Sequence, residues 1–392
     1  MSARGLDGLL ERAVDERALP GAVAVVGDRG GVVYEGAFGL LKVDGEEPVR
    51  ADTMFAIMSM TKAFTSVSAL QLIERGALEL EQPVADILPA FGELQVLEGF
   101  DGDAPRLRPP VRQATIRNLL THTSGLGYSF GNADLLRYHQ LSGTPDIMSG
   151  TLEGLKVPLV ADPGTRWEYG ISTDWLGQVV EAVSGKDLPS YCQEHIFGPL
   201  GMLDTTFAPN EEQAARMMAL HFRTPDGGLV QQSLELPEPE FASGGSGACS
   251  TGPDYMRFMR ALLRGGELDG EQLLRSETVD LAFSDHLNGA PLPADGMRSA
   301  MPELSNDVPA LPFAQGWGLG FRLVLEDMPG MRRAGTGDWG GLFNCNYWID
   351  RTAGLAGTML TQVLPFYDAK IVETAEAFEQ GVYAEVAVPN PA

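Results

Sequence analysis

Two residues that could do chemistry together, Ser59 and Lys62, lie three positions apart in the segment FAIMSMTKAF. Residues at this spacing share one face of a helix, so an amine can lie beside a hydroxyl. A serine attacks a carbonyl only after a base removes its proton, and a lysine can be that base when burial and positive neighbours lower its pKa. The pair therefore predicts nucleophilic catalysis by Ser59.

The same pair has a structural interpretation, in which Ser59 caps the N-terminus of a helix. That interpretation accounts for the serine but not for the lysine, because a capping box has Glu or Gln at this position. A cation in the first turn also opposes the helix dipole. Lysine is scarce here, since the chain has five lysines and 23 arginines. Local conflicts of this kind are expected at functional sites.

Three further segments carry recognisable patterns: NLLTHTSGLGY at 118–128, PGTRWEYGISTDWLG at 163–177 and GDWGGLFNCNYWID at 337–350. Together with the Ser-x-x-Lys segment they resemble the signature of the penicillin-binding and serine β-lactamase superfamily. The order of the segments is that of class C β-lactamases and family VIII carboxylesterases. The resemblance covers nearly the whole chain.

The resemblance implies three catalytic residues, with Ser59 as the nucleophile and Tyr169 at the position of the family's catalytic tyrosine. Lys62 and Tyr169 are then expected to share the proton of Ser59 and to pass one later to the leaving group and to the deacylating water. The family's oxyanion hole consists of two backbone N–H groups, which here belong to Ser59 and Leu342. Such donors stabilise the charge of the tetrahedral intermediate.

Two departures from the family pattern bear on the substrate. Trp339 stands where the family's Lys-Thr-Gly strand has its lysine, and Ile171 replaces the asparagine of Tyr-x-Asn. Both changes remove polar groups, so we expect Trp339, Gly340 and Gly341 to form an apolar wall that binds neutral esters better than carboxylates. We also expect Tyr128 to line the pocket, although packing within a loop is an equally good interpretation.

The function predicted from these residues is that of a carboxylesterase, which cleaves short neutral esters through an acyl-enzyme. A β-lactamase, a D-amino peptidase, an amidase or an acyltransferase using the same site are alternatives. A penicillin-binding module without turnover is less favoured, because Ser59, Lys62 and Tyr169 are all intact. We expect no cofactor and no metal, since the histidines lack metal-ligand spacing.

The predicted fold is α+β, and the resemblance implies the β-lactamase/transpeptidase-like form, an antiparallel sheet flanked by the two terminal helices. Turn signals and apolar periodicity support it. The elements expected are a helix at 4–18, a hairpin turning at 27–31, a helix from 59 to about 75, helices within 173–185 and 254–266, strands after 316 with a turn at 351–354, and a helix at 367–383. The segments 100–113 and 286–312 are expected to be loops.

This pattern predicts a discontinuous domain organisation. Residues 1–56 and 300–392 would form the sheet domain, and 57–299 would form a mainly helical domain with inserted loops. The active site is expected between the two domains.

The composition excludes several classes of partner. A formal net charge of −25 disfavours binding to nucleic acid and to anionic membranes. The three cysteines do not form a disulfide framework, and no apolar run has the length of a membrane span. The N-terminal segment carries acidic residues where a signal peptide would be apolar. We therefore expect a cytoplasmic enzyme that acts on a small-molecule ester.

Four other features suggest chemistry but are better explained otherwise. The segment GTGDWG at 335–340 has dinucleotide-binding spacing, yet a strand and not a helix is expected after it. Ser246 lies in a Gly-rich segment that lacks the last glycine of a nucleophile elbow. His122 is interpreted as a hydrogen-bonded structural histidine, and Asp174 as an acid that is simply favourable at a helix start.

Overall fold

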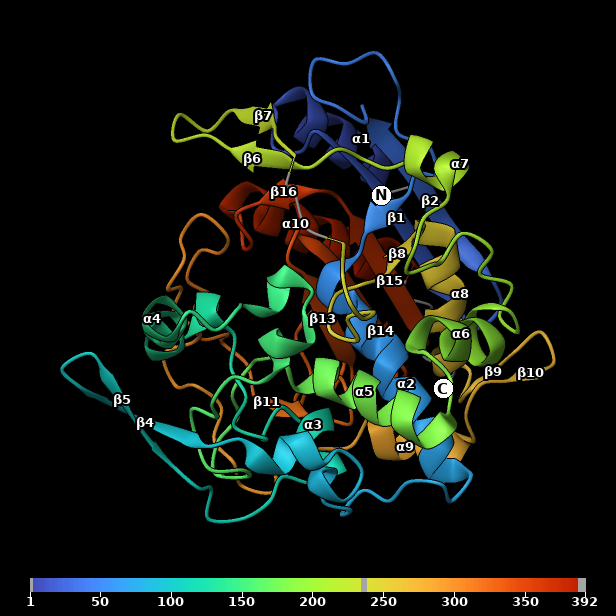
Figure 1. Cartoon of the computed structure of the whole chain (residues 1–392). Helices are drawn as coiled ribbons and strands as arrows, with labels where there is room; N and C mark the ends of the chain where they lie inside the picture. Colours follow the sequence, from blue (N-terminus) through green and yellow to red (C-terminus); the bar gives the residue numbers. More distant parts are fainter. Residues whose placement is uncertain (1–2, 234–237, 387–392) are drawn as a thin grey trace.

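A seven-stranded antiparallel sheet organises the chain in the computed structural model, which describes residues 3–233 and 238–386 (Figure 1). Its strand order is β11-β12-β13-β14-β15-β1-β2. The first and last parts of the sequence meet where β1 pairs with β15, in the register Val23↔Leu360. The sheet predicted from both chain ends is therefore confirmed. Its strands are β1 (Gly21–Asp28), β2 (Val32–Gly39), β11 (Gln315–Trp317), β12 (Arg322–Val324), β13 (Gly337–Gly341), β14 (Cys345–Asp350) and β15 (Leu355–Leu360).

Helices cover both faces of this sheet. The terminal helices α1 (Ala3–Asp15) and α10 (Ala369–Val386) pack against each other, and they share a hydrophobic cluster with Ala24 and Val26 of β1. Val23 and Val25 point to the other face, where α8 (Gly252–Leu263) packs on β1 and β15. Because side chains alternate along a strand, burial on both faces explains why β1 is apolar at every position from 22 to 26.

The body between the chain ends is mainly helical, as predicted. Helix α2 (Thr61–Glu74) packs against α5 (Ser172–Ser184), and both correspond to helices expected from the sequence. None of the described helices combines the length and the apolar composition needed to cross a bilayer. The shorter helices are α3 (Ile116–Leu120), α4 (Ala133–Ser142), α6 (Leu188–Cys192), α7 (Glu211–Ala215) and α9 (Ser276–Ala282).

One predicted loop is wrong. The segment at 100–113 contributes to a hairpin of β4 (Val96–Asp101) and β5 (Ala104–Arg108), which projects from the body in Figure 1. Gly102 closes its turn with a φ of +59°, a conformation that glycine adopts without strain. Pro105 is tolerated because a two-stranded ribbon leaves each strand with a free edge. The other segment, 286–312, contains no helix or strand, as predicted.

Small sheets connect distant segments around the main one. The pair β3 (Phe55–Ala56) and β8 (Cys249–Ser250) joins the residues before Ser59 to the start of α8. The others are β6 (His221–Arg223) with β7 (Leu229–Gln231) and β16 (Val363–Leu364), and β9 (Glu267–Leu268) with β10 (Glu271–Gln272). Helix α8 belongs to the predicted helical domain, 57–299, yet it packs on strands of the main sheet. The contacts therefore do not separate the two domains, and their boundaries stay a prediction.

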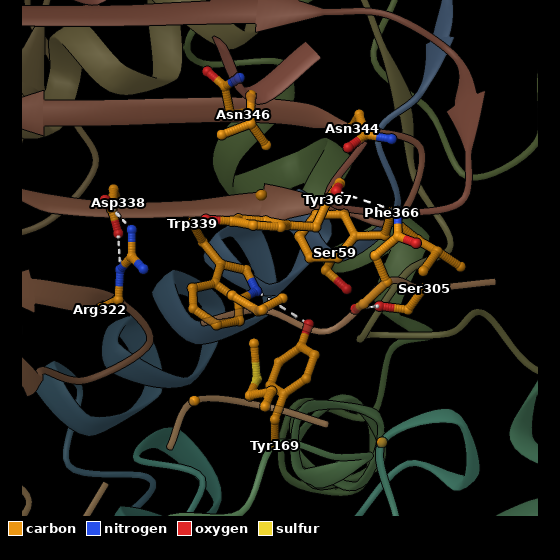
Figure 2. Close-up of a pocket in the computed structure, with 18 of the residues that line it drawn as sticks. Ser59, Tyr169, Ser305, Arg322, Asp338, Trp339, Asn344, Asn346, Phe366 and Tyr367 are labelled. Carbon is orange, nitrogen blue, oxygen red and sulfur yellow. Dashed lines mark hydrogen bonds and ion pairs between the residues drawn. The ribbon is translucent and has the colours of Figure 1, made fainter. Parts of the chain in front are cut away.

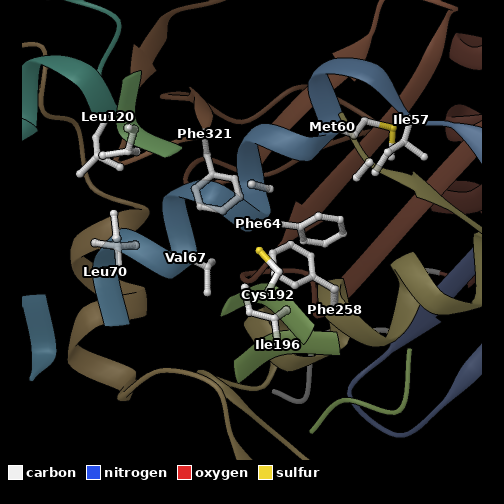
Figure 3. Close-up of a cluster of buried hydrophobic side chains, with 14 of the residues drawn as sticks. Ile57, Met60, Phe64, Val67, Leu70, Leu120, Cys192, Ile196, Phe258 and Phe321 are labelled. Atoms are coloured by element: carbon white, nitrogen blue, oxygen red, sulfur yellow. The ribbon is translucent and has the colours of Figure 1, made fainter. Parts of the chain in front are cut away.

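Helix α2 is buried on all sides, which is the condition that places Lys62 out of water. Every residue from 61 to 72 is buried. A helix that is enclosed all round carries no polar face to orient it, so its packing partners fix its position. Phe64 has edge contacts with Phe197 and Phe258, with ring centroids 5.0 and 4.8 Å apart. Figure 3 shows Phe64 beside Phe258.

We predict that Phe64→Ala lowers the free energy of unfolding by about 3–5 kcal/mol, because it removes a fully buried ring and leaves a cavity. Chemical denaturation followed by fluorescence measures the change. Leu203→Ala is the control, since this side chain is 87% exposed and should change stability by less than about 0.5 kcal/mol. A similar loss in both variants would contradict the role assigned to this cluster.

Candidate active site

The segment before α2 holds Ser59 in a constrained position. Ser59 lies in a 3₁₀ turn, Met58–Met60, that runs directly into α2. The Ile57 N–H donates to the carbonyl of Ala248 at 3.1 Å, which anchors the turn to the neighbouring loop. Met58 has a φ of +47°, a left-handed conformation that is unfavourable for a side chain of this kind. Backbone strain of this type is concentrated at functional sites.

Lys62 reaches the hydroxyl of Ser59, as the spacing predicted. The Lys62 Nζ atom lies 3.0 Å from Ser59 Oγ, 2.9 Å from the Tyr128 hydroxyl and 2.8 Å from the Gly245 carbonyl oxygen. The residue is 3% exposed. Three acceptors match the three hydrogens of an ammonium group, which has no lone pair to accept a proton.

Two tyrosines flank this lysine. The Nζ atom of Lys62 lies 4.9 Å from the ring centroid of Tyr169 and 5.2 Å from that of Tyr128. The Tyr169 hydroxyl accepts a hydrogen bond of 3.0 Å from Trp339 Nε1 (Figure 2). Burial, followed by the charge of Asp174, raises the pKa of Tyr128 well above its usual value. Tyr128 is thus held as a neutral phenol, whereas the oxygen of Tyr169 faces a donor.

The strand β13 borders the site through the part of its edge, from Trp339 on, that pairs with no other strand in the described part of the chain. The β12–β13 ladder consists of Arg322↔Asp338 and Leu323↔Gly337, so Trp339 and the residues after it pair with β14 only. Figure 2 shows the Trp339 side chain extending from this strand toward Tyr169. Sequence analysis placed Trp339 in the substrate pocket but did not find its hydrogen bond to Tyr169, because no local pattern joins residues 170 positions apart.

The two glycines after Trp339 differ in position. Gly340 lines the cavity, whereas Gly341 faces the segment that carries Ser59. A Cβ atom on Gly341 would collide with the carbonyl oxygen of Ile57, so only glycine allows β13 to approach so closely. Leu342 follows at the cavity wall, and its N–H donates to no backbone acceptor among the described residues. The oxyanion hole of Ser59 and Leu342 stays a prediction.

A cavity of ≈ 530 Å³ opens beside these residues. Ser59, Tyr128 and Tyr169 all line it, as does Trp339. Such a volume suits a drug-sized ligand rather than a single short acyl chain. Much of its wall is apolar and adaptable, because five methionines and several aromatic rings contribute to it. These residues are Met58, Met148, Met297, Met328, Met331, Phe130, Phe313, Phe366, Trp167 and Trp339.

Charged residues line the cavity beyond Trp339, and sequence analysis missed them. Arg322 lies 5.8 Å from the Trp339 ring and forms two hydrogen bonds of 2.7 Å with Asp338. Arg332 contacts Asp338 as well, and it forms a two-fold pair with Glu379 of α10 at 2.6 and 2.7 Å. Burial, reinforced by Arg332, lowers the pKa of Arg322. The two cations and two anions compensate each other, so the cluster has no net charge.

Two of the alternative features have structural roles. His122 is buried among the rings of Trp167, Tyr169 and Trp317. The expectation of a hydrogen-bonded histidine is wrong for its Nδ1 atom, which has no partner among the described residues. Burial, followed by the charge of Lys62, lowers the pKa of His122 well below its usual value. Ser246 borders the cavity, and its Oγ is hydrogen-bonded to Ser243 Oγ at 2.9 Å.

Asp174 lies in the first turn of α5, as expected from the sequence. It is 1% exposed and accepts hydrogen bonds from Ser243 Oγ at 2.5 Å and from the Gly245 N–H at 3.1 Å. This deep burial was not predicted. In residues 3–233 and 238–386, no group of three or more His, Cys, Asp or Glu side chains is arranged to hold a metal ion.

Comparison with known proteins places this geometry in context. The sequence profile described as Beta-lactamase matches residues 6–380. The chain is 35% identical over 401 residues to a monacolin J acid methylbutanoyltransferase of Aspergillus terreus, covering 97% of this chain and 95% of that protein. It is 33% identical over 400 residues to a lovastatin esterase of Penicillium rubens, covering 96% and 98%.

Two solved structures resemble this chain over nearly its whole length. Unliganded simvastatin synthase from Aspergillus terreus has a TM-score of 0.84 and 32% identity, covering 97% of this chain and 98% of that one. A hydrolase with promiscuous acyltransferase activity, EstCE1, has a TM-score of 0.75 at 23% identity, covering 96% and 98%. The second similarity shows the fold alone.

We predict that Gly341→Ala pushes β13 away from Ile57, because the new methyl group has no space. The free energy of unfolding should fall by about 1–3 kcal/mol. Labelling of Ser59 by a fluorophosphonate should slow by about tenfold to a hundredfold as the geometry is displaced. Gly31→Ala is the control, since a Cβ there meets no atom within 4 Å. Unchanged labelling in Gly341→Ala would refute the close approach.

Proposed function

The chain belongs to the Beta-lactamase family and has its fold, and from this premise we propose that it is a serine acyltransferase that works through an ester on Ser59. The contact of 3.0 Å between Lys62 Nζ and Ser59 Oγ, beside a cavity of ≈ 530 Å³, carries this proposal. It supports an activated hydroxyl with room for both an acyl group and an acceptor.

In the first step Ser59 Oγ attacks the carbonyl carbon of the acyl donor while its proton passes to the phenolate oxygen of Tyr169, which becomes a neutral phenol. The N–H groups of Ser59 and Leu342 stabilise the oxyanion that forms. The carbon–oxygen bond to the leaving alcohol then breaks, and the alcohol departs with the proton from Tyr169. Ser59 remains as an acyl ester, and Tyr169 is again ready to accept a proton.

In the second step an acceptor hydroxyl attacks the acyl ester and gives its proton to Tyr169. Collapse of the intermediate releases the new ester, and Ser59 Oγ regains the proton. Lys62 keeps its three hydrogens throughout, because each already has an acceptor. The proton therefore moves through Tyr169, whose oxygen receives the Trp339 N–H, and Lys62 supplies positive charge.

The acceptor is an alcohol rather than water in this proposal. The sequence favoured hydrolysis of short neutral esters and gave acyl transfer as an alternative. Two observations now support transfer: relatives that cover nearly the whole chain include a methylbutanoyltransferase, and the cavity exceeds the needs of a short acyl group. Ester hydrolysis is the second candidate, and similarity to a lovastatin esterase supports it. In both cases the acyl-enzyme on Ser59 is the same.

Product partition separates the two candidates. With 4-nitrophenyl butyrate as donor, we predict that monacolin J acid, cyclohexanol or decahydro-2-naphthol diverts butyryl groups from water, so butyrate esters accumulate while free butyrate falls. Liquid chromatography with mass detection measures both products. Butyrate as the sole product at every acceptor concentration would establish a hydrolase. Ser59→Ala should form neither product, and turnover in that variant would refute the nucleophile.

The two tyrosines provide a matched test of the proton pathway. Tyr169→Phe removes the proposed base and should lower kcat by about 10²–10⁴-fold. Tyr128→Phe removes one acceptor of Lys62 but leaves the proton pathway intact, so its loss should be much smaller. Initial rates under saturating donor measure both variants. Equal losses, or a larger loss in Tyr128→Phe, would show that the base is assigned to the wrong ring.

A further inference from the structure

The first turn of α5 buries a carboxylate that the mechanism above does not use. Asp174 is 1% exposed, and burial raises its pKa. Its Oδ2 atom has no hydrogen-bond partner among the described residues. An unpaired buried charge is costly, so the residue requires an explanation beyond helix capping.

One peptide unit connects Asp174 to Lys62. Asp174 Oδ1 accepts the N–H of Gly245 at 3.1 Å, and the carbonyl oxygen of the same residue accepts from Lys62 Nζ at 2.8 Å. Thr65, on the next turn of α2, donates to the Gly244 carbonyl at 2.8 Å. A Cβ atom on Gly245 would strike the Asp174 carboxylate. The loop at 243–246 is thus fitted between α2 and α5.

The charges of Asp174 and Lys62 also act on each other directly. Among the groups that favour ionised Asp174, Lys62 has the largest effect. The effect is reciprocal, because a buried carboxylate stabilises a nearby ammonium by the same free energy. In a site removed from water this attraction is screened much less than on the surface.

We propose that Asp174 is a positioning residue whose buried charge and loop contacts orient the Lys62 amine toward Ser59, and that it thereby sets the pH range in which the enzyme works. This inference rests on the proposed function. The carboxylate acts through the 243–246 loop, which fixes one acceptor of Lys62, and through its negative charge. It touches neither the donor nor the acceptor of the acyl group.

The sign of the pH effect follows from the groups around Asp174. The charge of Lys62, on α2, acts on Asp174, and the charge of Asp174 acts on Tyr128, in the segment after α3. Tyr169 lies beside Lys62, with its ring centroid 4.9 Å from Nζ, and His122 packs against Tyr169. Without the negative charge, the ammonium of Lys62 is less favoured and phenolates are more favoured. Both changes move the midpoints of the pH–rate profile for acylation to lower pH. His122 does not add a midpoint in the working range, because burial keeps it neutral.

The test is the pH dependence of Ser59 acylation in Asp174→Asn. This substitution preserves shape and an oxygen for the Gly245 N–H but removes the charge. A fluorophosphonate labels Ser59 only in folded molecules, and intact mass counts the labelled molecules. The measurement therefore reports on the folded fraction. We expect the midpoints of both limbs of the pH–rate profile for Ser59 acylation, the acidic and the alkaline limb, to move to lower pH by about one unit or more. Midpoints equal to the wild type, or moved upward, would overturn the inference even if the rate falls.

The matched control is Asp254→Asn. Asp254 is also buried in the first turn of a helix, α8, where it accepts hydrogen bonds from the Asp204 N–H at 2.8 Å and Thr205 Oγ1 at 3.0 Å. Its pKa is likewise raised by burial, but Lys62 is not among the charges that act on it. We expect a loss of stability with unchanged midpoints. A shift equal to that in Asp174→Asn would overturn the inference by making the effect nonspecific.

Ser243→Ala separates the charge from the hydrogen bonding. It removes the donor at 2.5 Å but leaves the carboxylate, so its midpoints should stay within a few tenths of the wild type. A full shift in Ser243→Ala would mean that the loop geometry and not the charge sets the range. Label found on a residue other than Ser59 in the wild type would refute the proposed function instead, which keeps the two failures distinguishable.

Discussion

The site depends on the burial of one ammonium group. An isolated charge in a protein interior is expensive, and α2 places Lys62 where almost no water reaches it. Three oxygen acceptors and a buried carboxylate compensate for the lost hydration. Each partner comes from a different part of the chain, so Lys62 can be buried in this way only when the whole fold has assembled around it.

This constraint explains several features that otherwise look unrelated. Gly244 and Gly245 lie between α2 and the first turn of α5, where a Cβ atom would collide with Thr173 or Asp174. Gly341 allows β13 to approach the strained turn at Met58. Tyr128 supplies an acceptor to Lys62, and burial raises its pKa, whereas the oxygen of Tyr169, the base in the proposed mechanism, receives the Trp339 N–H.

The cavity adds a second level of organisation. Its apolar, methionine-rich wall adapts to ligands of different shape, whereas its charged cluster is neutral overall and anchored to α10. The reactive groups are therefore fixed, and the surfaces that hold the rest of the substrate are permissive. Under the proposed function, an acyl-enzyme in such a site would be open to attack by a bulky alcohol as well as by water, and the competition between them would decide whether esters are made or cleaved.

The sequence by itself determined the fold and the reactive pair. Periodicity and turn residues located the sheet formed by both chain ends, α2, α5, α8 and the terminal helices, because these signals are local. The spacing of Ser59 and Lys62 predicted their contact for the same reason, since one helical turn fixes it. The hairpin at 96–108 was missed because its stability comes from pairing, which proline and charge conceal in a linear reading.

Only the tertiary structure decided how the pair is surrounded. The hydrogen bond from Trp339 to Tyr169, the burial of Asp174 and the Arg322–Asp338 pair join residues from separate elements. Spacing cannot reveal such contacts, because the distance between two elements is set by packing across the core. An aspartate at a helix start carries the same local signal whether it faces water or an ammonium, and its role follows from what the fold places opposite it.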